Sequence, residues 1–460
     1  MPTTTFASLP PDIVDRILTL LPNFRALSAA LRASKSLIYN VFLNHPLSIT
    51  HAIAYNLIGP ALPQALRIIQ IKHWLDEDGY HGFSNAAPED EIIQACPLTR
   101  LIGEKLEEYA DVASGLEDLF SLRFKNRLSK TSLLTPQEAL RFHRALYRTW
   151  ACTVINAEVT DEDVTDDEEE DEDQDDDDDD PVDPLTRCRV KIIYALLNDL
   201  STTEIREVYD LVLFLNLVAR WVMCEQQVQH VAVTEPNIIW YAFSQGIPSD
   251  LTSFNAGIWD GPRNIDSALS QIWTERKVRS DRYLDTRSKA ILEEVEGENA
   301  ACERCGFVGG LELWGPTNLI LWLRNTNVQE LSSGIFLPGL LSNNRDITDW
   351  IKNSLIFGRD DNGNSTFDFE ELMNGLVDIG NEREGAGRWS RDRWYCNDCV
   401  GELFRRFFWR WILLHKTKRG ETIHDDCWYG YNCRTMTHRL EHARKLNHLC
   451  IPTRGEGAGV

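Results

Sequence analysis

The sequence lacks a positively charged leader and a long apolar run. Its first residues, "MPTTTFASLPPDIVDRIL", contain no basic segment followed by an apolar stretch, so we expect no secretory signal. The most apolar segment, "LVLFLNLVARWVMC" at 211–224, is too short to span a bilayer and is interrupted by Asn216 and Arg220. We therefore predict a buried helix there and no membrane partner.

The sequence also lacks a recognisable catalytic motif. It contains no phosphate-binding glycine loop, no paired-carboxylate motif and no Ser-His-Asp order typical of hydrolases. Five of the eleven histidines lie between 415 and 448, and three of these are beside cysteines, where metal ligation accounts for them. We therefore predict a binding protein and not an enzyme, although it could be a non-catalytic subunit of one.

Basic residues are absent from the segment that dominates the charge of the chain. Residues 161–180, "DEDVTDDEEEDEDQDDDDDD", hold 17 acidic residues. The formal net charge is −24, but outside this segment 54 acidic residues face 47 basic ones, an ordinary balance. Like charges at this density repel one another and bury nothing. We predict an acidic, disordered linker or insertion at 161–184, a spacer in preference to a site for basic partners such as histones.

The rest of the composition predicts a folded, mainly α-helical chain. Hydrophobic residues make up 43% of the 460 residues, and 14 tryptophans are present, which is typical of chains with buried cores. In "TPQEALRFHRALYRTWAC", Thr135, Pro136 and Glu138 form a helix start. We predict helical regions at 46–160 and 185–296. The acidic segment could interrupt one domain or separate two.

Eleven cysteines, with two CxxC pairs and nearby histidines, indicate metal binding in a reducing compartment, nuclear or cytoplasmic. Cys302-x2-Cys305 and Cys396-x2-Cys399 each allow two sulfurs to face one ion. Together they predict a four-thiolate structural zinc site that braces a cysteine-rich region at 297–425. A redox CxxC is the alternative, but neither pair lies in a strand-to-helix context.

A second metal site is predicted in "DCWYGYNCRTMTHRLEHARKLNHLC", residues 426–450. Cys427, Cys433, His442 and His448 follow the spacing C-x5-C-x8-H-x5-H. A ββα finger requires about twelve residues between its second cysteine and first histidine, so that fold is excluded. We expect His438 on the surface beside the ligands. The sequence thus predicts two zinc ions per chain.

The residues around this second site resemble the poly(ADP-ribose)-binding zinc finger, carried by "DCWYGYNCRT", "HARKLNHLC" and "IPTR" at 426–453 and just beyond. The likeness is closest to the finger of checkpoint ubiquitin ligases with forkhead-associated and RING domains. The segments "DITDWIKNSL" and "WYCNDCVGELFRRF" resemble the cysteine-rich region of those ligases. The resemblance implies that Cys450 is not a ligand, and that Trp428, Tyr429 and Arg434 contact the adenine of ADP-ribose.

A ring beside a guanidinium suits that ligand, because adenine offers a face for stacking and the pyrophosphate offers negative charge. Arg434, Arg439, Arg444 and Lys445 make this end of an acidic chain basic. Two alternatives are a purely structural zinc knob with inward-facing aromatic rings, and nucleic-acid binding by the same surface, which we do not favour.

The N-terminal residues 1–45 resemble an F-box. Apolar residues at helical spacing in "LPPDIVDRILTLLPNFRALSAALRASKSLIYNVF" predict two or three short helices, the first ending at Pro22. The F-box family binds the Skp-type adaptor of cullin ubiquitin ligases. The residues that match its contact surface are Leu9, Pro10, Ile13, Ile17, Leu18 and Leu27. The alternative is a helical hairpin that caps the following domain.

Two further segments could each have a binding function or a purely structural role. "DDNGNSTFDFEE" at 360–371 fits a twelve-position calcium loop with candidate ligands Asp360, Asn362, Asn364, Asp368 and Glu371. Ser365 occupies the position that requires glycine, so we expect a polar helix–loop–helix and no calcium. "LFRRFFWRWILLHKTKR" at 403–419 could bind membranes or nucleic acid, but we expect a core helix seated on the four-cysteine site.

These features together predict an adaptor that couples ADP-ribose chains on target proteins to a cullin ubiquitin ligase. An ADP-ribose-reading chromatin or DNA-damage protein without a ligase is one alternative. A purely structural zinc protein is the other.

Overall fold

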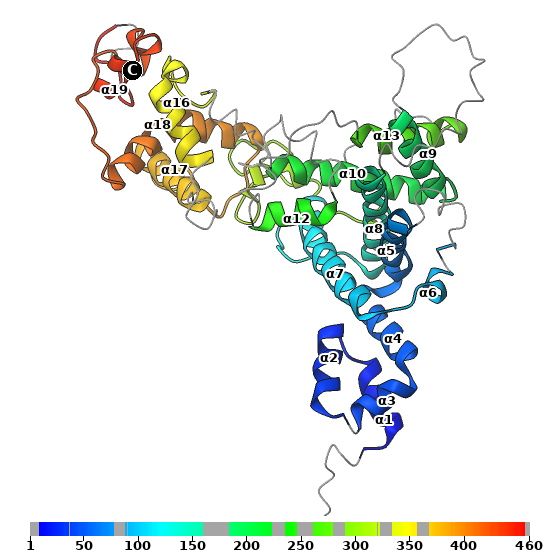
Figure 1. Cartoon of the computed structure of the whole chain (residues 1–460). Helices are drawn as coiled ribbons and strands as arrows, with labels where there is room; N and C mark the ends of the chain where they lie inside the picture. Colours follow the sequence, from blue (N-terminus) through cyan, green and yellow to red (C-terminus); the bar gives the residue numbers. More distant parts are fainter. Residues whose placement is uncertain are drawn as a thin grey trace, which may run out of the picture.

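The computed structural model of the protein describes residues 9–35, 37–77, 88–89, 91–159, 184–222, 235–245, 261–278, 290–319, 321–322, 334–356 and 368–455. These residues form helices joined by turns, and the β-pairing among them is limited to three isolated bridges. The prediction of a mainly α fold is therefore confirmed. Figure 1 shows an N-terminal lobe, a helical body and a C-terminal arm. Within the described ranges, no helix has the length and apolar character needed to cross a membrane.

The N-terminal lobe contains α1 (Pro11–Thr19), α2 (Phe24–Ala33), α3 (Ile38–Asn44) and α4 (Pro46–Ile58). The first helix starts with proline, whose missing N–H costs nothing at that position, and ends before Pro22 as predicted. Asn23 caps α2 by accepting a hydrogen bond from the Ala26 N–H at 2.8 Å. Val14 and Leu18 are the buried side of α1, so its other apolar side faces solvent.

The helical body is arranged around one buried helix, α8 (Pro136–Glu158). This helix contacts α5, α7, α9, α10 and α13. Its start has the predicted capping box, in which the Thr135 side chain accepts from the Glu138 N–H and Glu138 accepts from the Thr135 N–H. The other elements of the body are η2 (Gly59–Ala61), α5 (Leu62–Glu77), α6 (Ile92–Ala95), α7 (Arg100–Phe120), α9 (Pro184–Asn198), α10 (Thr202–Val222), α12 (Pro236–Gln245) and α13 (Gly261–Glu275).

The helices on the two sides of the acidic segment pack against each other. α8 contacts α9, and both contact α13. The Arg189 guanidinium also donates to the Val159 carbonyl at 2.7 Å. The two flanks therefore belong to one helical bundle. The acidic residues themselves lie outside the described residues.

The helices predicted for 185–296 end at Glu275 in the described part, and residues 290–296 form turns. The polar groups of this segment bond to the body instead of to one another. The Glu293 N–H donates to Glu138 at 2.7 Å, the Glu296 N–H donates to the Lys125 carbonyl at 3.0 Å, and the Ile291 carbonyl accepts from Arg141 at 2.9 Å. Long-range partners thus override the local helical pattern.

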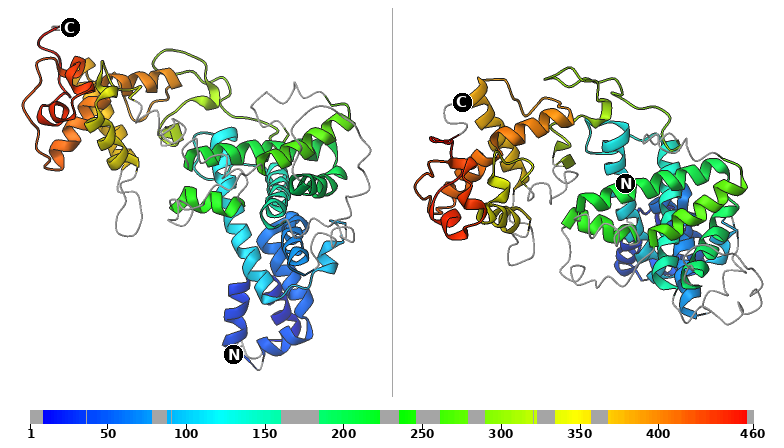
Figure 2. Two further views of the ribbon diagram at one scale, coloured as in Figure 1. Left: turned by 45° about the horizontal axis from the view of Figure 1, so that its top comes forward. Right: turned by 90° about the horizontal axis from the view of Figure 1, so that it is seen from above.

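Two arginines join the body to the C-terminal arm. A short π-helix, η4 (Ser121–Lys125), follows α7 and carries Arg123, which donates to the Leu311 carbonyl at 3.0 Å. Just beyond it, the Arg127 guanidinium donates to the Gly310 carbonyl at 2.9 Å and lies 4.5 Å from the centre of the Trp394 ring. Figure 2 shows residues 290–319 leading from the body toward the arm.

The C-terminal arm is built on α18 (Asn397–Lys418). Phe404, Phe408 and Trp411 are buried on one side of this helix, while Arg405 and Arg406 are exposed. The prediction of a core helix at 403–419 is therefore confirmed. The arm also contains η9 (Gly310–Glu312), η10 (Leu341–Asn343), α16 (Arg345–Ile351), η11 (Lys352–Ile356), α17 (Phe369–Glu384), η12 (Gly430–Asn432), η13 (Thr435–Thr437) and α19 (Leu440–Lys445).

Candidate metal centres and the finger surface

The structure brings the four cysteines of the two CxxC pairs together. Their sulfurs all lie within 4.8 Å of one another, with 3.8 Å between Cys302 and Cys399 and 3.6 Å between Cys305 and Cys396. A tetrahedral shell with metal–sulfur bonds of about 2.3 Å has sulfur–sulfur edges of about 3.8 Å. A disulfide would need about 2.05 Å. The set therefore fits a metal ion and not a pair of disulfides.

The first cysteine pair lies on a tight turn. The Cys302 N–H donates to the Phe307 carbonyl at 2.7 Å, and the Gly306 N–H donates to the Cys302 carbonyl at 2.8 Å. Gly306 has a φ of 78°, a left-handed conformation that residues with a Cβ adopt only with strain. Glycine directly after Cys305 therefore allows the chain to return and point both sulfurs to one side.

The second cysteine pair lies at the N-terminus of α18. Cys396 is the N-cap residue and Cys399 is in the first turn, where the positive end of the helix favours thiolates. Trp314 and Tyr395 exchange two backbone hydrogen bonds of 2.8 and 2.9 Å, which holds the strand-like segment before Cys396 beside the first pair. Cys305 is thus held beside Cys396, 91 positions away, and Cys302 beside Cys399, 97 positions away.

The environment shifts the pKa of three of these thiols. Burial raises the pKa of the Cys396 and Cys399 thiols. Burial also acts on Cys302, but backbone N–H groups from Cys305, Cys396 and Arg304 outweigh it and lower the pKa of the Cys302 thiol to about 7. Because only the deprotonated sulfur binds a metal ion, occupancy of this site would release protons.

An ionic cluster that was not predicted surrounds the four-cysteine site. Arg304, between the first two cysteines, lies 3.0 Å from Glu402 of α18 and 3.8 Å from the centre of the Trp389 ring. Glu384 of α17 accepts from the Trp389 indole at 3.1 Å and pairs with Arg406. This cluster ties the first cysteine turn to α17 and α18, which positions the ligands from outside.

The second predicted ligand set is also brought together. The ligand atoms of Cys427, Cys433, His442 and His448 lie within 4.8 Å of one another. The Nε2 atom of His442 lies 3.3 Å from the Cys433 sulfur and 3.9 Å from the Cys427 sulfur. These distances bracket the edge of about 3.6 Å that a tetrahedral site with mixed sulfur and nitrogen ligands has. The prediction of two Cys/His clusters able to hold metal ions is confirmed.

His448 gives independent support for a metal at this finger. Its side chain is 1% exposed, and neither ring nitrogen has a hydrogen-bond partner among the described residues. Buried polar groups are almost always paired, so an unpaired imidazole beside two thiols fits a metal ligand. Burial, with a smaller effect of His442, lowers the pKa of His448 to about 4. The ring is therefore neutral at pH 7, the form that binds metal.

Two neighbouring residues are not ligands, as predicted. His438 is exposed and lies outside the ligand cluster. Cys450 is half-buried, and its thiol donates to the carbonyls of Cys427 and Asn447 at 3.5 and 3.4 Å. Cys450 thus bonds the backbone of a ligand residue without joining the ligand set.

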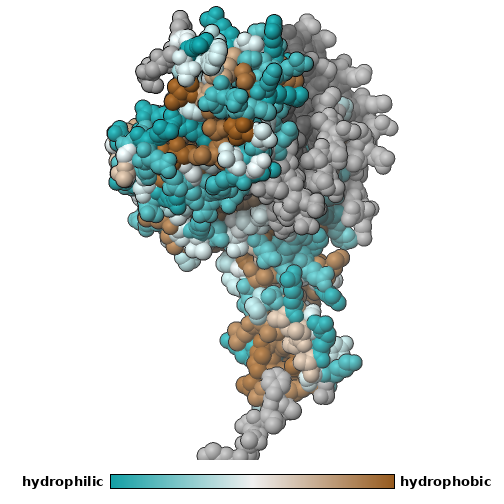
Figure 3. All heavy atoms as spheres, turned by 90° about the vertical axis from the view of Figure 1, so that its left-hand side faces the viewer, coloured by the Kyte–Doolittle hydropathy of each residue, from teal (hydrophilic) through white to brown (hydrophobic). Residues whose placement is uncertain are grey.

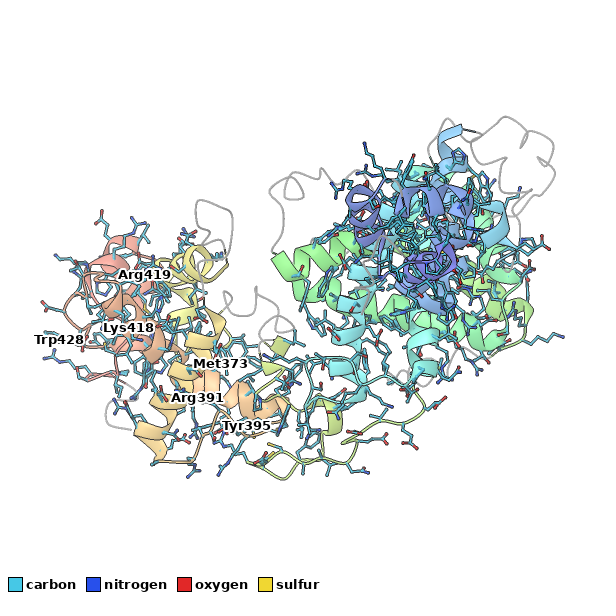
Figure 4. All side chains as sticks on the ribbon, turned by 90° about the horizontal axis from the view of Figure 1, so that it is seen from below. Met373, Arg391, Tyr395, Lys418, Arg419 and Trp428 are labelled. Atoms are coloured by element: carbon cyan, nitrogen blue, oxygen red, sulfur yellow. The ribbon has the colours of Figure 1, made fainter. Side chains whose placement is uncertain are left out.

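The finger exposes the aromatic residues that follow its first cysteine. Trp428 is 58% exposed, Tyr429 is 48% exposed, and Arg434 is exposed as well. Gly430 makes this possible, because its φ of 43° turns the chain and a Cβ there would overlap the Cys450 carbonyl oxygen. Figure 4 places Trp428 at the outer edge of the C-terminal arm.

One residue of this surface was not predicted. The Arg454 guanidinium lies 3.7 Å from the centre of the Trp428 ring. Arg454 ends the segment "IPTR", but the sequence does not indicate which ring this arginine contacts. Among the described residues, Arg434, Arg439, Lys445 and Arg454 have no carboxylate partner, whereas Arg444 pairs with Asp346 at 3.5 Å. The surface therefore carries cations available to an anion.

Contacts with the rest of the C-terminal arm hold the finger in place. The Tyr431 carbonyl accepts from the Leu340 N–H at 2.8 Å, and the Tyr431 ring meets the Trp409 ring edge-on at 5.8 Å. Asn344 contacts the Met436 sulfur at 3.4 Å. The finger is therefore fixed to η10, α16 and α18 through Tyr431 and Met436, while Trp428 and Tyr429 stay exposed.

The residues predicted to contact a Skp-type adaptor divide into two groups. Pro10 and Ile17 are exposed, Ile13 is 44% exposed and Leu9 is half-buried, whereas Leu18 and Leu27 lie in the core of the lobe. Positions 10, 13, 17 and 20 follow helical spacing and form one apolar side of α1. Figure 3 shows hydrophobic residues gathered on the surface of the N-terminal lobe.

The calcium candidates are only partly within the described residues. Asp360, Asn362 and Asn364 lie outside them. Asp368 caps α17 by accepting from the N–H groups of Glu370 and Glu371 at 2.8 and 3.0 Å. Glu371 pairs with Lys418 at 3.1 Å. Both described carboxylates thus have partners within the protein.

The fold and the two ligand sets define a helical protein with two Cys/His clusters able to hold metal ions. No protein-family model, curated protein or solved structure matches the chain. The donor atoms and the exposed side chains are therefore the basis for assigning a function.

Proposed function

We propose that the protein is a non-catalytic adaptor that binds ADP-ribose chains through its C-terminal finger and a Skp-type adaptor of a cullin ubiquitin ligase through its N-terminal lobe. The observation that carries the proposal is the finger surface, where Trp428, Tyr429 and Arg434 are exposed around buried ligands. The N-terminal function is supported by the exposed apolar side of α1. A nuclear or cytoplasmic location suits both partners and the reduced cysteines.

Zinc is the metal we propose for both sites, because four thiolates and a Cys2His2 set are the ligands of structural zinc. Cys302, Cys305, Cys396 and Cys399 would hold one ion, and Cys427, Cys433, His442 and His448 the other. Zinc supplies cross-links and no chemistry here, since protein ligands fill all four positions of each site. Its role in recognition is to hold the backbone so that Trp428 and Arg434 stay at the surface.

Loss of the finger surface should abolish polymer binding. The double variant Trp428→Ala with Arg434→Ala removes a stacking ring and a guanidinium, and we expect affinity for poly(ADP-ribose) to fall by about 100-fold or more. Fluorescence polarisation of labelled polymer with the full-length protein measures this. The matched control, Tyr55→Ala with Arg32→Ala, removes an exposed ring and an exposed guanidinium from the N-terminal lobe and should leave affinity unchanged.

Polymer binding that survived the finger variant, with metal content intact, would contradict the assigned surface. It would favour a purely structural finger, which is the second candidate function. The observation that supports this second candidate is the inward packing of Tyr431 and Met436 on the arm.

Binding of the Skp-type adaptor should depend on the apolar side of α1. Ile13→Asp places a charge on a 44% exposed position, so the fold should persist while capture of the purified adaptor falls by tenfold or more. Leu213→Asp, on the 40% exposed position of α10, is the control and should bind as the wild type does. If the wild type fails to bind the adaptor, the ligase link is lost and an ADP-ribose reader without a ligase remains.

A further inference from the structure

The chain after the last metal ligand returns across the exposed rings of the finger. The Trp428 carbonyl accepts from the N–H groups of Thr453 and Arg454 at 2.8 and 2.9 Å, and from the Thr453 hydroxyl at 3.2 Å. A Cβ on Gly455 would lie 3.3 Å from the Tyr429 ring. Residues 453–455 are therefore fixed against both rings.

This tail places the Arg454 guanidinium over the Trp428 ring. The guanidinium carbon lies 3.7 Å from the ring centre, yet Trp428 remains 58% exposed. A guanidinium that stacks on an aromatic ring keeps its N–H donors in its own plane, where they can meet an anion side-on. Because no carboxylate within the described residues pairs with Arg454, these donors have no acidic partner there.

We propose that Arg454 is a second cation of the ADP-ribose site and binds the diphosphate of the ligand while the adenine stacks on the exposed rings. This inference rests on the proposed function of the finger. A diphosphate carries two negative charges, and Arg434 supplies one positive charge on this surface. Arg454 supplies a second positive charge from the segment that follows the last metal ligand.

The tail contacts make Arg454 effective because its position is set before the ligand arrives. Two backbone hydrogen bonds and the stack on Trp428 restrict the side chain in the free protein. Less conformational freedom is then lost on binding than with a free surface arginine. The same geometry predicts selectivity, since a ligand without phosphates gains nothing from Arg454.

The test uses full-length protein and labelled poly(ADP-ribose), with free ADP-ribose and adenosine as competitors. For Arg454→Ala we expect the affinity for the polymer to fall by about 10- to 100-fold. The wild type should prefer ADP-ribose over adenosine by at least about tenfold, and this preference should narrow in the variant. Arg454→Lys, which keeps the charge without the planar stack, should recover only part of the affinity. Arg405→Ala, the control, removes an exposed cation of α18 outside the finger and should change affinity by less than about threefold.

Three results would overturn the inference. If the wild type binds polymer and Arg454→Ala behaves as the Arg405→Ala control does, the finger reads ADP-ribose without this residue. If the preference for ADP-ribose over adenosine is unchanged in Arg454→Ala, the residue stabilises the ring and does not contact phosphate. If single-stranded RNA binds as tightly as the polymer and loses the same factor, Arg454 is a general phosphate contact. Failure of the wild type to bind ADP-ribose at all is a separate outcome, because it removes the proposed function itself.

Discussion

Removal of metal is expected to unfold the C-terminal arm while the helical body stays folded. Structural zinc contributes about 10–16 kcal/mol in small domains, which is comparable to the whole stability of a typical domain. In the arm, the metal ligands join the turn at 302–305 to α18 and close the finger. The core of the body, which includes Phe120, Phe142, Trp150 and Phe214, contains no residue of either ligand set.

Two measurements test whether the arm binds two metal ions and unfolds without them. Metal analysis of the purified protein should give two zinc ions per chain, and near-ultraviolet circular dichroism should report loss of tryptophan packing in the arm after chelation. Far-ultraviolet signal from the body should persist. A single zinc per chain, or an arm that keeps its tertiary signal without metal, would contradict the two-site assignment.

Single substitutions separate the two sites. Cys396→Ser should lose the ion of the four-cysteine site, and Cys433→Ser should lose that of the finger, so each variant retains about one zinc per chain. Cys450→Ser is the control, because Cys450 lies in the finger and bonds the Cys427 carbonyl without belonging to the ligand cluster. It should keep both ions.

Glu138→Gln is expected to destabilise the helical body by about 3–5 kcal/mol, because it leaves a buried charge without its partner. Glu138 is completely buried and lies 2.9 Å from the ammonium of Lys125, which is itself largely buried. The same carboxylate accepts from the N–H groups of Thr135 and Glu293 at 2.8 and 2.7 Å. It therefore connects α8, η4 and the turns at 290–296.

Chemical denaturation of the variant measures this loss. Glu293→Gln is the matched control, since Glu293 pairs with Arg141 at 2.8 Å on the surface and should contribute less than about 1 kcal/mol. Adding Lys125→Met to Glu138→Gln removes the orphaned ammonium and should recover part of the stability. A Glu138→Gln loss no larger than that of Glu293→Gln would show that the buried pair is not important for stability.

The same carboxylate gives the body a defined sensitivity to acid. Burial raises the pKa of Glu138, but the backbone N–H groups of Thr135 and Glu293, together with Lys125, outweigh it and hold that pKa below its ordinary value of 4.5. The unfolded chain thus binds a proton more readily than the folded one. The contribution of Glu138 is complete above about pH 4.5 and is lost as the pH falls through the folded pKa. The stability difference between wild type and Glu138→Gln should shrink over that interval.

The candidate metal ligands could be predicted because the spacing within each CxxC pair and within the finger is local. Cys302 and Cys305 are three residues apart, and the finger ligands lie within 22 residues, so the sequence itself brings them into range. The first turn of α1 and the capping box at Thr135 are local in the same sense. Local patterns were sufficient for these elements.

Contacts between distant segments that carry no metal-ligand motif could not be predicted. Arg127 bonds a carbonyl 183 residues away, and Arg304 meets a glutamate 98 residues away. Nothing in the neighbouring sequence distinguishes these two arginines from surface arginines. The hydrophobic periodicity therefore does not indicate their partners. The contact of Arg454 with Trp428 joins residues 26 positions apart, so local periodicity does not indicate it either.

The separation of the cysteine pairs has a consequence for synthesis of the protein. Cys305 and Cys396 are 91 residues apart, so at a translation rate of about 5–20 residues per second the first pair leaves the ribosome roughly 5–20 seconds before the second. During that interval two thiols are present without their partners. Faithful assembly therefore requires a reducing environment and a metal supply that outlast the delay, and ribosomal pausing between the pairs should lower the yield of correctly loaded protein.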